Sequence, residues 1–244
     1  KARDLSKQAK ILSRRFEESF WCDELSTYAL ALDGRKQPCK VRTSNAGHCL
    51  FAGIATPEHA RRVAATLTDE ASWSGWGIRT VATSEARYNP MSYHNGSVWP
   101  HDNSLIAAGF ARYDLKESTA TVLAGLLDAS LFLDLHRLPE LFCGFPRRPG
   151  EAPTLYPVAC APQSWASGAV FLLLEACLGL NVSAPERRVT FSKPILPRFL
   201  QQVTIRGLKV GDARLDLLLT RHDEGDVGVN VLRRDGVLDV VVLK

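Results

Sequence analysis

The spacing of apolar residues along the chain changes near residue 180. Up to that point, apolar residues recur every three or four positions, which is typical of helices. Thr56, Pro57 and Glu58 form a helix start, with a threonine cap and a proline in the first turn. We predict helices over residues 4–20, 103–113, 117–136 and 163–178, besides the one that begins at Thr56.

Two of these helices carry most of the predicted core. In the helix over residues 163–178, the run AVFLLLEACLGL is apolar almost all round, so we expect it to be buried on most sides. The helix over residues 117–136 carries a wide apolar stripe, formed by Val122, Leu123, Leu126, Leu127 and Leu131.

Beyond the segment NVSAPERR the apolar period becomes two, which is typical of strands. Leu215, Leu217 and Leu219 alternate with their neighbours in this way. Asp235-Gly236 accommodates the positive φ angles of a tight turn, and it predicts a hairpin between VNVLRR and VLDVVVL. We therefore expect the tail to be a small antiparallel β unit whose role is packing.

Composition narrows the class of protein. The 244 residues are 45% hydrophobic, and the net charge of +4 comes without a dense basic block, so no nucleic-acid partner is expected. The six cysteines include no C-x-x-C pair, which argues against a zinc site and favours a reduced, cytoplasmic chain. No signal peptide or membrane-length apolar run occurs, so no membrane partner is expected.

The candidate chemistry lies in long loops at helix boundaries. The stretch MSYHNGSVWPHDN (residues 91–103) places aromatic rings beside hydrogen-bonding side chains. Rings that stack on a pyranose, next to groups that bind its hydroxyls, predict a sugar site. Each aromatic taken alone could instead belong to the core. The candidate substrate-binding residues are Trp76, Arg79, Tyr93, His94, Asn95, Trp99, His101, Asp102, Gln163 and Trp165.

Several of these polar residues have simpler interpretations. Asp102 could accept a sugar hydroxyl, act as an acid, or cap the helix that starts near residue 103. His94 and His101 could join Asp102 in a metal site, but no helical spacing fixes such a site, and we predict no metal. His48 could be a capping or core histidine.

Glu140 is the candidate catalytic residue. It lies between Pro139 and the apolar pair Leu141 and Phe142. A carboxylate in such surroundings tends to have a raised pKa unless donors stabilise it, and it can deprotonate a water held against it. The alternative is a surface glutamate that pairs with an arginine.

These motifs together resemble one enzyme family. SYHNGSVWPHDN resembles the Y-H-x-G-[ST]-V-W-P motif of bacterial glycogen-debranching-type amylo-α-1,6-glucosidases, and LPELFCGFPR resembles the segment that closes their catalytic domain. TSNAGHCLFAGIA and GWGIRT are similar to the same group, which is related to the mannosylglycerate-hydrolase and trehalase-like clan of (α/α)6 toroids.

The resemblance implies a mainly α fold: half of an (α/α)6 toroid over residues 1–182, followed by a small antiparallel β domain over residues 183–244. It implies an inverting hydrolase of an α-glucan or small α-glucoside that uses no cofactor. Glu140 would be the general base, and Tyr93, His94, Asn95, Trp99 and the segment from Gln163 to Trp165 would line the sugar subsite.

The chain departs from the family at the general acid. The G-x-D-[AT]-T motif that carries this aspartate in relatives is absent. We therefore expect a fragment, inactive by itself, whose partner is the missing N-terminal half of the same enzyme. Two alternatives remain open: a non-catalytic carbohydrate-binding module, and a sugar epimerase that transfers protons through histidines.

Overall fold

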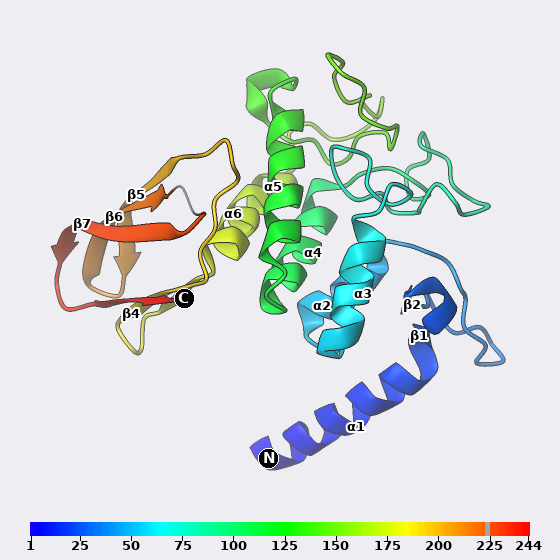
Figure 1. Cartoon of the computed structure of the whole chain (residues 1–244), viewed down its shortest axis with the longest axis horizontal. Helices are drawn as coiled ribbons and strands as arrows, with labels where there is room; N and C mark the ends of the chain where they lie inside the picture. The colour runs from blue at the N-terminus through cyan, green and yellow to red at the C-terminus, as the bar shows by residue number, and fades with distance from the viewer. Residues whose placement is uncertain (223–224) are drawn as a thin grey trace.

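The computed structural model describes residues 1–222 and 225–244, and it has a helical body and a β unit (Figure 1). The helices are α1 (Ala2–Phe20), α2 (Asn45–Ala52), α3 (Pro57–Leu67), α4 (Pro100–Arg112), α5 (Lys116–Ser130) and α6 (Ser164–Leu178). The strands are β1 (Trp21–Cys22), β2 (Thr27–Tyr28), β3 (Leu180–Ser183), β4 (Arg188–Ser192), β5 (Gln202–Val210), β6 (Ala213–Arg221), β7 (Val227–Asp235) and β8 (Asp239–Leu243).

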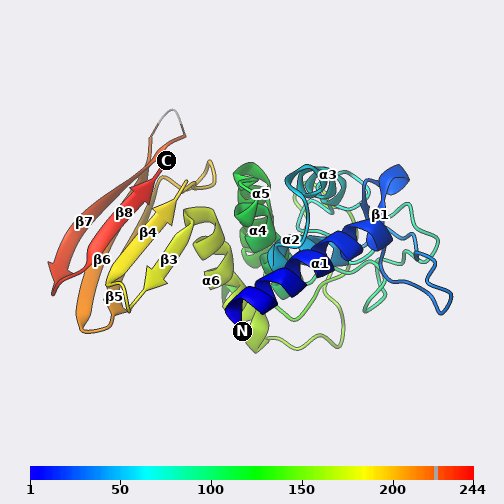
Figure 2. The same cartoon turned by 90° about the horizontal axis from the view of Figure 1, so that it is seen from below.

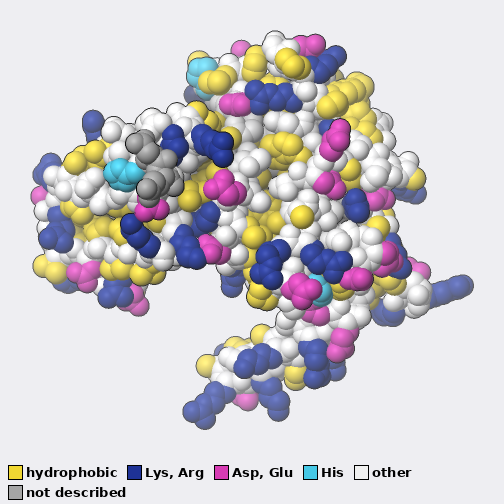
Figure 3. Space-filling view, in the orientation of Figure 1, with side chains coloured by type: hydrophobic (Ala, Val, Ile, Leu, Met, Phe, Trp, Pro, Cys, Tyr) yellow, Lys and Arg dark blue, Asp and Glu magenta, His cyan; other side chains and the backbone are white. Residues whose placement is uncertain are grey.

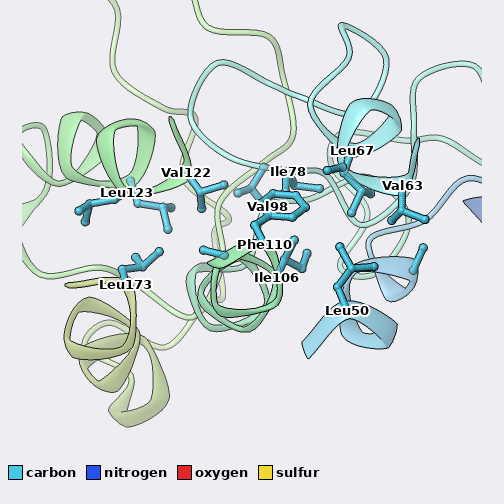
Figure 4. Packing of buried hydrophobic residues seen from close by; sticks show 14 of the residues in the cluster. Leu50, Val63, Leu67, Ile78, Val98, Ile106, Phe110, Val122, Leu123 and Leu173 are labelled. Carbon is cyan, nitrogen blue, oxygen red and sulfur yellow. The ribbon is translucent and has the colours of Figure 1, made fainter. Parts of the chain in front are cut away.

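The helical body has two layers. Helices α2, α4 and α6 lie side by side, and α3 and α5 cover them on one face (Figure 2). Figure 4 shows the apolar side chains between the layers, where Leu50 of α2 and Phe110 of α4 approach Val63 of α3 and Val122 of α5. Long loops after α3 and α5 gather on one side of these layers (Figure 1). The layers therefore form a rigid support for those loops.

Helix α1 is attached to the body near its C-terminal end. Phe16 and Phe20 pack against the core, whereas Leu5 and Leu12 are exposed. The N-terminal part projects from the body, and Lys and Arg side chains cover much of its surface (Figures 1 and 3). No helix in the described part of the chain is long and apolar enough to cross a membrane.

Some of the predicted helix starts and ends agree with the structure, and others do not. The Thr56 hydroxyl accepts a 3.1 Å hydrogen bond from the His59 N–H, so the predicted cap is confirmed. The helix expected from residue 103 begins earlier, at Pro100, and the one expected to reach residue 136 ends at Ser130. Because the chain turns away there, Leu131 is 67% exposed, and its predicted place in the apolar stripe is wrong.

The prediction that α6 is buried on most sides is also wrong. Phe171 is 74% exposed and Trp165 is 46% exposed, whereas Leu173 and Cys177 are buried. One face of α6 packs against α4 and α5, and Trp165 and Phe171 lie outside this contact. An apolar run identifies residues that can be buried, but it does not show which other element of the protein would pack against them.

The β unit differs from the predicted hairpin. Strands β5, β6 and β7 form an antiparallel sheet, and Leu215, Leu217 and Leu219 are buried as their alternation predicts. Strand β8, however, pairs with β4 in parallel and not with β7. The chain turns at Gly236, which has a φ of 88°, and Leu238 is then buried in the core of the β unit before β8 begins. The predicted small antiparallel sheet is confirmed in β5–β7, whereas the predicted hairpin between β7 and β8 is wrong.

Candidate active site

Two loops that are far apart in the sequence are joined at the site. Val98 and Phe142 form an antiparallel bridge, with the Val98 N–H donating to the Phe142 carbonyl at 2.9 Å and the reverse bond at 3.0 Å. Both side chains are fully buried. This bridge fixes the loop that carries Tyr93 beside the loop that carries Glu140.

A close glycine contact extends this junction. A Cβ atom on Gly144 would lie 1.6 Å from the Gly96 carbonyl oxygen, so only glycine fits at position 144. Gly96 itself has a φ of 146°, which disfavours other residues. The Gly144 N–H also donates to the Pro90 carbonyl at 2.8 Å. The two loops therefore touch through their backbones.

Glu140 is held by donors and not by apolar neighbours alone. The Tyr93 hydroxyl donates a 2.6 Å hydrogen bond to Glu140 Oε1, and the Cys160 N–H donates to Oε2 at 3.3 Å. These bonds, with a further contribution from the Gln163 side chain, lower the pKa of the Glu140 carboxyl below its ordinary value. Glu140 is therefore ionised at neutral pH, which is the state that a general base needs.

Tyr93 is correspondingly kept protonated. Its bond to Glu140 and its partial burial raise the pKa of the Tyr93 hydroxyl to about 12. The ring meets Trp99 edge-on, with the centroids 4.8 Å apart, and it contacts Tyr156 and His94 in the same way. The Trp99 indole N–H donates to the Tyr93 carbonyl at 3.1 Å. Aromatic packing and hydrogen bonds thus set the direction of the Tyr93 hydroxyl.

A cavity of about 610 Å³ opens beside Tyr93. This volume lies within the range of about 300–1,000 Å³ that is typical of small-molecule sites. Its walls come mainly from the segments that lead into α2, α4 and α6, the three helices of one layer. The lining residues are Leu30, Thr43, Ser44, Asn45, Thr80, Val81, Tyr93, His94, Asn95, Trp99, His101, Asp102 and Trp165.

Most of the predicted substrate-binding residues gather in this cavity. Tyr93, His94, Asn95, Trp99, His101, Asp102 and Trp165 line it. The His101 ring stacks on the Trp165 indole, with the centroids 4.1 Å apart and the planes 12° from parallel. Gln163, the residue before α6, contributes to the environment of Glu140. A second cavity, of about 630 Å³, lies between α5 and the β unit, away from Glu140.

Trp76 and Arg79 are placed elsewhere. Arg79 is 2% exposed, and its guanidinium donates to the backbone carbonyls of Gly144 at 2.7 Å and of Glu70 and Ala71 at 3.3 Å. Trp76 is 3% exposed and lies beneath the Arg147 guanidinium. Neither side chain lines the cavity. Trp76 packs in the core, and Arg79 holds the surrounding loops together through its hydrogen bonds.

Asp102 is not the cap of α4. The capping position is Trp99, whose side chain makes no capping bond, and Asp102 lies inside the first turn. Its Oδ1 atom is hydrogen-bonded to His48 Nε2, and this partner raises the pKa of the His48 imidazole. From the sequence, His48 has the interpretation of a capping or core residue, and no local pattern links it to Asp102, which lies 54 residues further along the chain.

Asn103 is a further residue that the sequence did not single out. It is fully buried, and its amide accepts from the Ile78 N–H at 2.7 Å and donates to the Ile78 and Trp99 carbonyls at 3.0 Å. This amide connects the start of α4 to the loop after α3. Within the described ranges, no group of three or more His, Cys, Asp or Glu side chains is arranged to hold a metal ion.

Comparisons with known proteins give one family match and several similar solved structures. The family model for the mannosylglycerate hydrolase MGH1-like glycoside hydrolase domain matches residues 1–137. A crystal structure of GH63 mannosylglycerate hydrolase from Thermus thermophilus in complex with glucose is 22% identical over 64% of this chain and 36% of that one, with a TM-score of 0.48. Neutral trehalase Nth1 from Saccharomyces cerevisiae is 18% identical over 70% of this chain and 30% of its own, with a TM-score of 0.54.

These matches cover only part of each chain. The chain spans about a third of the length of these two solved structures, and the likeness to the trehalase concerns the fold alone. No curated protein sequence matches the chain. The family match includes Tyr93 and Trp99 but ends before Glu140. The place of Glu140 in the site therefore rests on its own contacts.

Proposed function

This chain belongs to the MGH1-like glycoside hydrolase family, and from that membership we propose that it forms part of an inverting hydrolase of an α-linked glucoside, with Glu140 as the general base. The observation that carries this proposal is the hydrogen bond that joins Glu140 to Tyr93, a residue that lines the cavity. Glu140 is 8% exposed and is not among the lining residues, but its bonding partner Tyr93 is. We propose that a water molecule held by this ionised carboxylate reaches a sugar bound beside Tyr93.

The proposed reaction begins with a water molecule bound to the free lone pairs of Glu140. Glu140 takes a proton from this water as the oxygen attacks the anomeric carbon. Tyr93 keeps its own proton throughout, because the pKa of its hydroxyl is raised to about 12. The Tyr93 hydroxyl thus orients the base without competing for the proton that the base must accept.

The walls of the cavity support a sugar as the ligand. Trp99 and Trp165 present indole rings, and Asn95 and Asp102 present groups that can bind hydroxyls. A small number of placed polar groups among aromatic surfaces is typical of a site that fixes the orientation of a small molecule. We propose an α-glucan or a small α-glucoside as the substrate, of which the α-1,6 branch of glycogen is one.

Inversion requires a second carboxyl group. It must lie about 6.5–9.5 Å from the base, so that the leaving oxygen is protonated while water enters from the opposite face. Asp102 is already engaged by His48, so we assign it to substrate binding. We propose that the acid comes from a part of the protein outside these 244 residues, and that α1–α6 and this part together form an (α/α)6 toroid.

The test is an assay of the gene product that contains this chain and its upstream part. We expect hydrolysis of at least one member of a panel of α-1,4- and α-1,6-linked glucosides, trehalose and mannosylglycerate. NMR should detect the β anomer as the first product. Release of the α anomer would contradict the inverting mechanism. Binding of sugars without any hydrolysis would indicate a carbohydrate-binding module, and interconversion of epimers would indicate an epimerase.

The role of Glu140 is tested by Glu140→Gln in the same protein. We expect kcat to fall by about 10³-fold or more, with little change in sugar affinity, since general-base catalysis contributes about 10²–10⁴-fold. Glu151→Gln is the matched control, because Glu151 lies on the same long loop but is exposed and pairs with Arg148. Near-normal turnover by Glu140→Gln would remove Glu140 from the mechanism.

A further inference from the structure

A histidine–aspartate pair spans two helices at the wall of the cavity. His48 lies in the first turn of α2 and Asp102 in the first turn of α4, and His48 Nε2 is hydrogen-bonded to Asp102 Oδ1. The two helices pack closely, since a Cβ atom on Gly47 would lie 2.6 Å from the Ile106 side chain. The position of the pair is therefore fixed by the backbones of both helices.

Asp102 is buried, and part of its hydrogen-bonding capacity is unused. The residue is 8% exposed and lines the cavity beside His101 and Trp165. Asp102 Oδ2 and His101 Nδ1 are both buried without a hydrogen-bond partner in the described chain. Buried polar atoms in native structures are nearly always paired. Two unpaired atoms on consecutive residues of one cavity wall indicate a ligand that supplies the missing partners.

The chemistry of the two groups defines what that ligand offers. A carboxylate oxygen only accepts hydrogen bonds, so its partner must be a donor. Burial lowers the pKa of His101, which keeps its imidazole neutral, and a neutral imidazole has one donor and one acceptor nitrogen. Adjacent hydroxyls of a sugar can satisfy both groups, because each hydroxyl donates and accepts.

We propose that Asp102 and His101 bind neighbouring hydroxyls of a neutral hexose, and that His48 is the positioning residue that fixes the Asp102 carboxylate for this contact. This inference rests on the proposed function only in taking a sugar as the ligand of the cavity. The lining residues in the described chain include no Lys or Arg, so nothing on these walls compensates a negative charge on the sugar. The pair therefore selects neutral sugars against sugar acids and sugar phosphates.

A second histidine–carboxylate pair provides a matched control. His59 of α3 is bonded to Glu17 of α1 through Nδ1 and Oε2 at 2.7 Å, and its ring stacks on Trp21 with the centroids 3.6 Å apart. None of these residues lines the cavity. Substitutions at His59 report the cost of losing an interhelical histidine pair without a change at the sugar site.

The experiment is a titration of this chain with methyl α-glucoside, followed by calorimetry and by the fluorescence of its tryptophans. We expect Asp102→Asn and His48→Leu to weaken binding at least tenfold. His48→Gln retains a side-chain N–H that can donate to Asp102, so it should stay within about threefold of the wild type. His59→Leu should lower the melting temperature but leave the affinity unchanged, and thermal unfolding of every variant will identify those that fail to fold.

Three results would overturn the inference: unchanged affinity in folded Asp102→Asn, equal losses in His48→Gln and His48→Leu, or no binding of the glucoside by the wild-type chain. Equal affinity for glucuronate or glucose 6-phosphate would overturn the selection of neutral sugars. Glu140→Gln separates the two proposals. If this variant binds the glucoside normally and the complete protein hydrolyses nothing, the catalytic proposal fails while the Asp102 contact stands.

Discussion

The hydroxyl of Tyr93 donates a 2.6 Å hydrogen bond to Oε1 of Glu140, which lies 47 residues further along the chain. Apolar neighbours of Glu140 in the sequence favour a raised pKa, but the donors found in the structure lower it. The same bond raises the pKa of Tyr93 to about 12. A single contact therefore lowers the pKa of Glu140 and raises the pKa of Tyr93.

Removing this contact should move the pH dependence of catalysis in a known direction. In Tyr93→Phe, Glu140 loses the donor that contributes most to its lowered pKa, so the pKa of Glu140 rises. A base with a higher pKa becomes protonated at higher pH. We therefore expect the acidic limb of the kcat/KM profile of the complete enzyme to shift to higher pH.

Tyr156→Phe is the control for this shift. Tyr156 packs against the Tyr93 ring at a centroid distance of 5.6 Å, but no hydrogen bond joins it to Glu140 in the structure. The acidic limb of the kcat/KM profile of Tyr156→Phe should coincide with that of the wild type. An unshifted profile in Tyr93→Phe would show that Tyr93 does not set the ionisation of the base.

The glycine contact between the two loops should not tolerate a methyl group. In Gly144→Ala the new Cβ would lie 1.6 Å from the Gly96 carbonyl, and backbone atoms cannot rotate out of the way. We expect a loss of at least about 1–3 kcal/mol in the free energy of unfolding, as for other overpacked sites. Separation of the loops should also weaken sugar binding.

Gly34→Ala is the matched substitution for Gly144→Ala. A Cβ atom on Gly34 meets nothing within 4 Å, and this glycine has no positive φ. Chemical denaturation and glucoside titration of both variants will compare the two positions. Equal stability and equal affinity in Gly144→Ala and Gly34→Ala would contradict the close packing of the loops.

Arg79 should matter for the order of the loops and not for contact with sugar. Arg79→Met removes the guanidinium hydrogen bonds to the carbonyls of Gly144, Glu70 and Ala71, and hydrogen bonds that involve a charged group contribute about 1.5–3 kcal/mol. We expect a lower melting temperature and faster proteolysis of the loop that carries Glu140. Arg148→Met, at an exposed position on the same loop, should change neither quantity. A stable Arg79→Met variant that loses only sugar affinity would restore Arg79 to the substrate-binding set.

The sequence predicts the elements that depend on local chemistry. The cap at Thr56 and the alternation of Leu215, Leu217 and Leu219 are local patterns, and the structure confirms them. The stretch from residue 91 to residue 103 also supplies six of the cavity residues, because the segment from Tyr93 to Asp102 leads directly into one helix.

Other features depend on contacts between distant segments and left no local signal. The pairing of β8 with β4 is set by the burial of Leu238 and Val240, while the local Asp235-Gly236 turn favours a hairpin. His48 and Asp102 are 54 residues apart, and only the packing of α2 on α4 brings them together. The sequence places Arg79 among the donors and acceptors predicted to bind sugar hydroxyls, yet its guanidinium donates to backbone carbonyls.

The one-sided burial of α6 gives a final prediction, from two residues that are two positions apart. Leu173 is 1% exposed, so Leu173→Ala should cost about 2–5 kcal/mol through the lost contacts and the cavity that it leaves. Phe171 is 74% exposed, so Phe171→Ser should change the free energy of unfolding by no more than about 0.5 kcal/mol. Urea denaturation of this chain measures both values. If Phe171→Ser destabilises the chain as much as Leu173→Ala does, the outer face of α6 is covered in solution. The prediction from the sequence that α6 is buried on most sides would then be right.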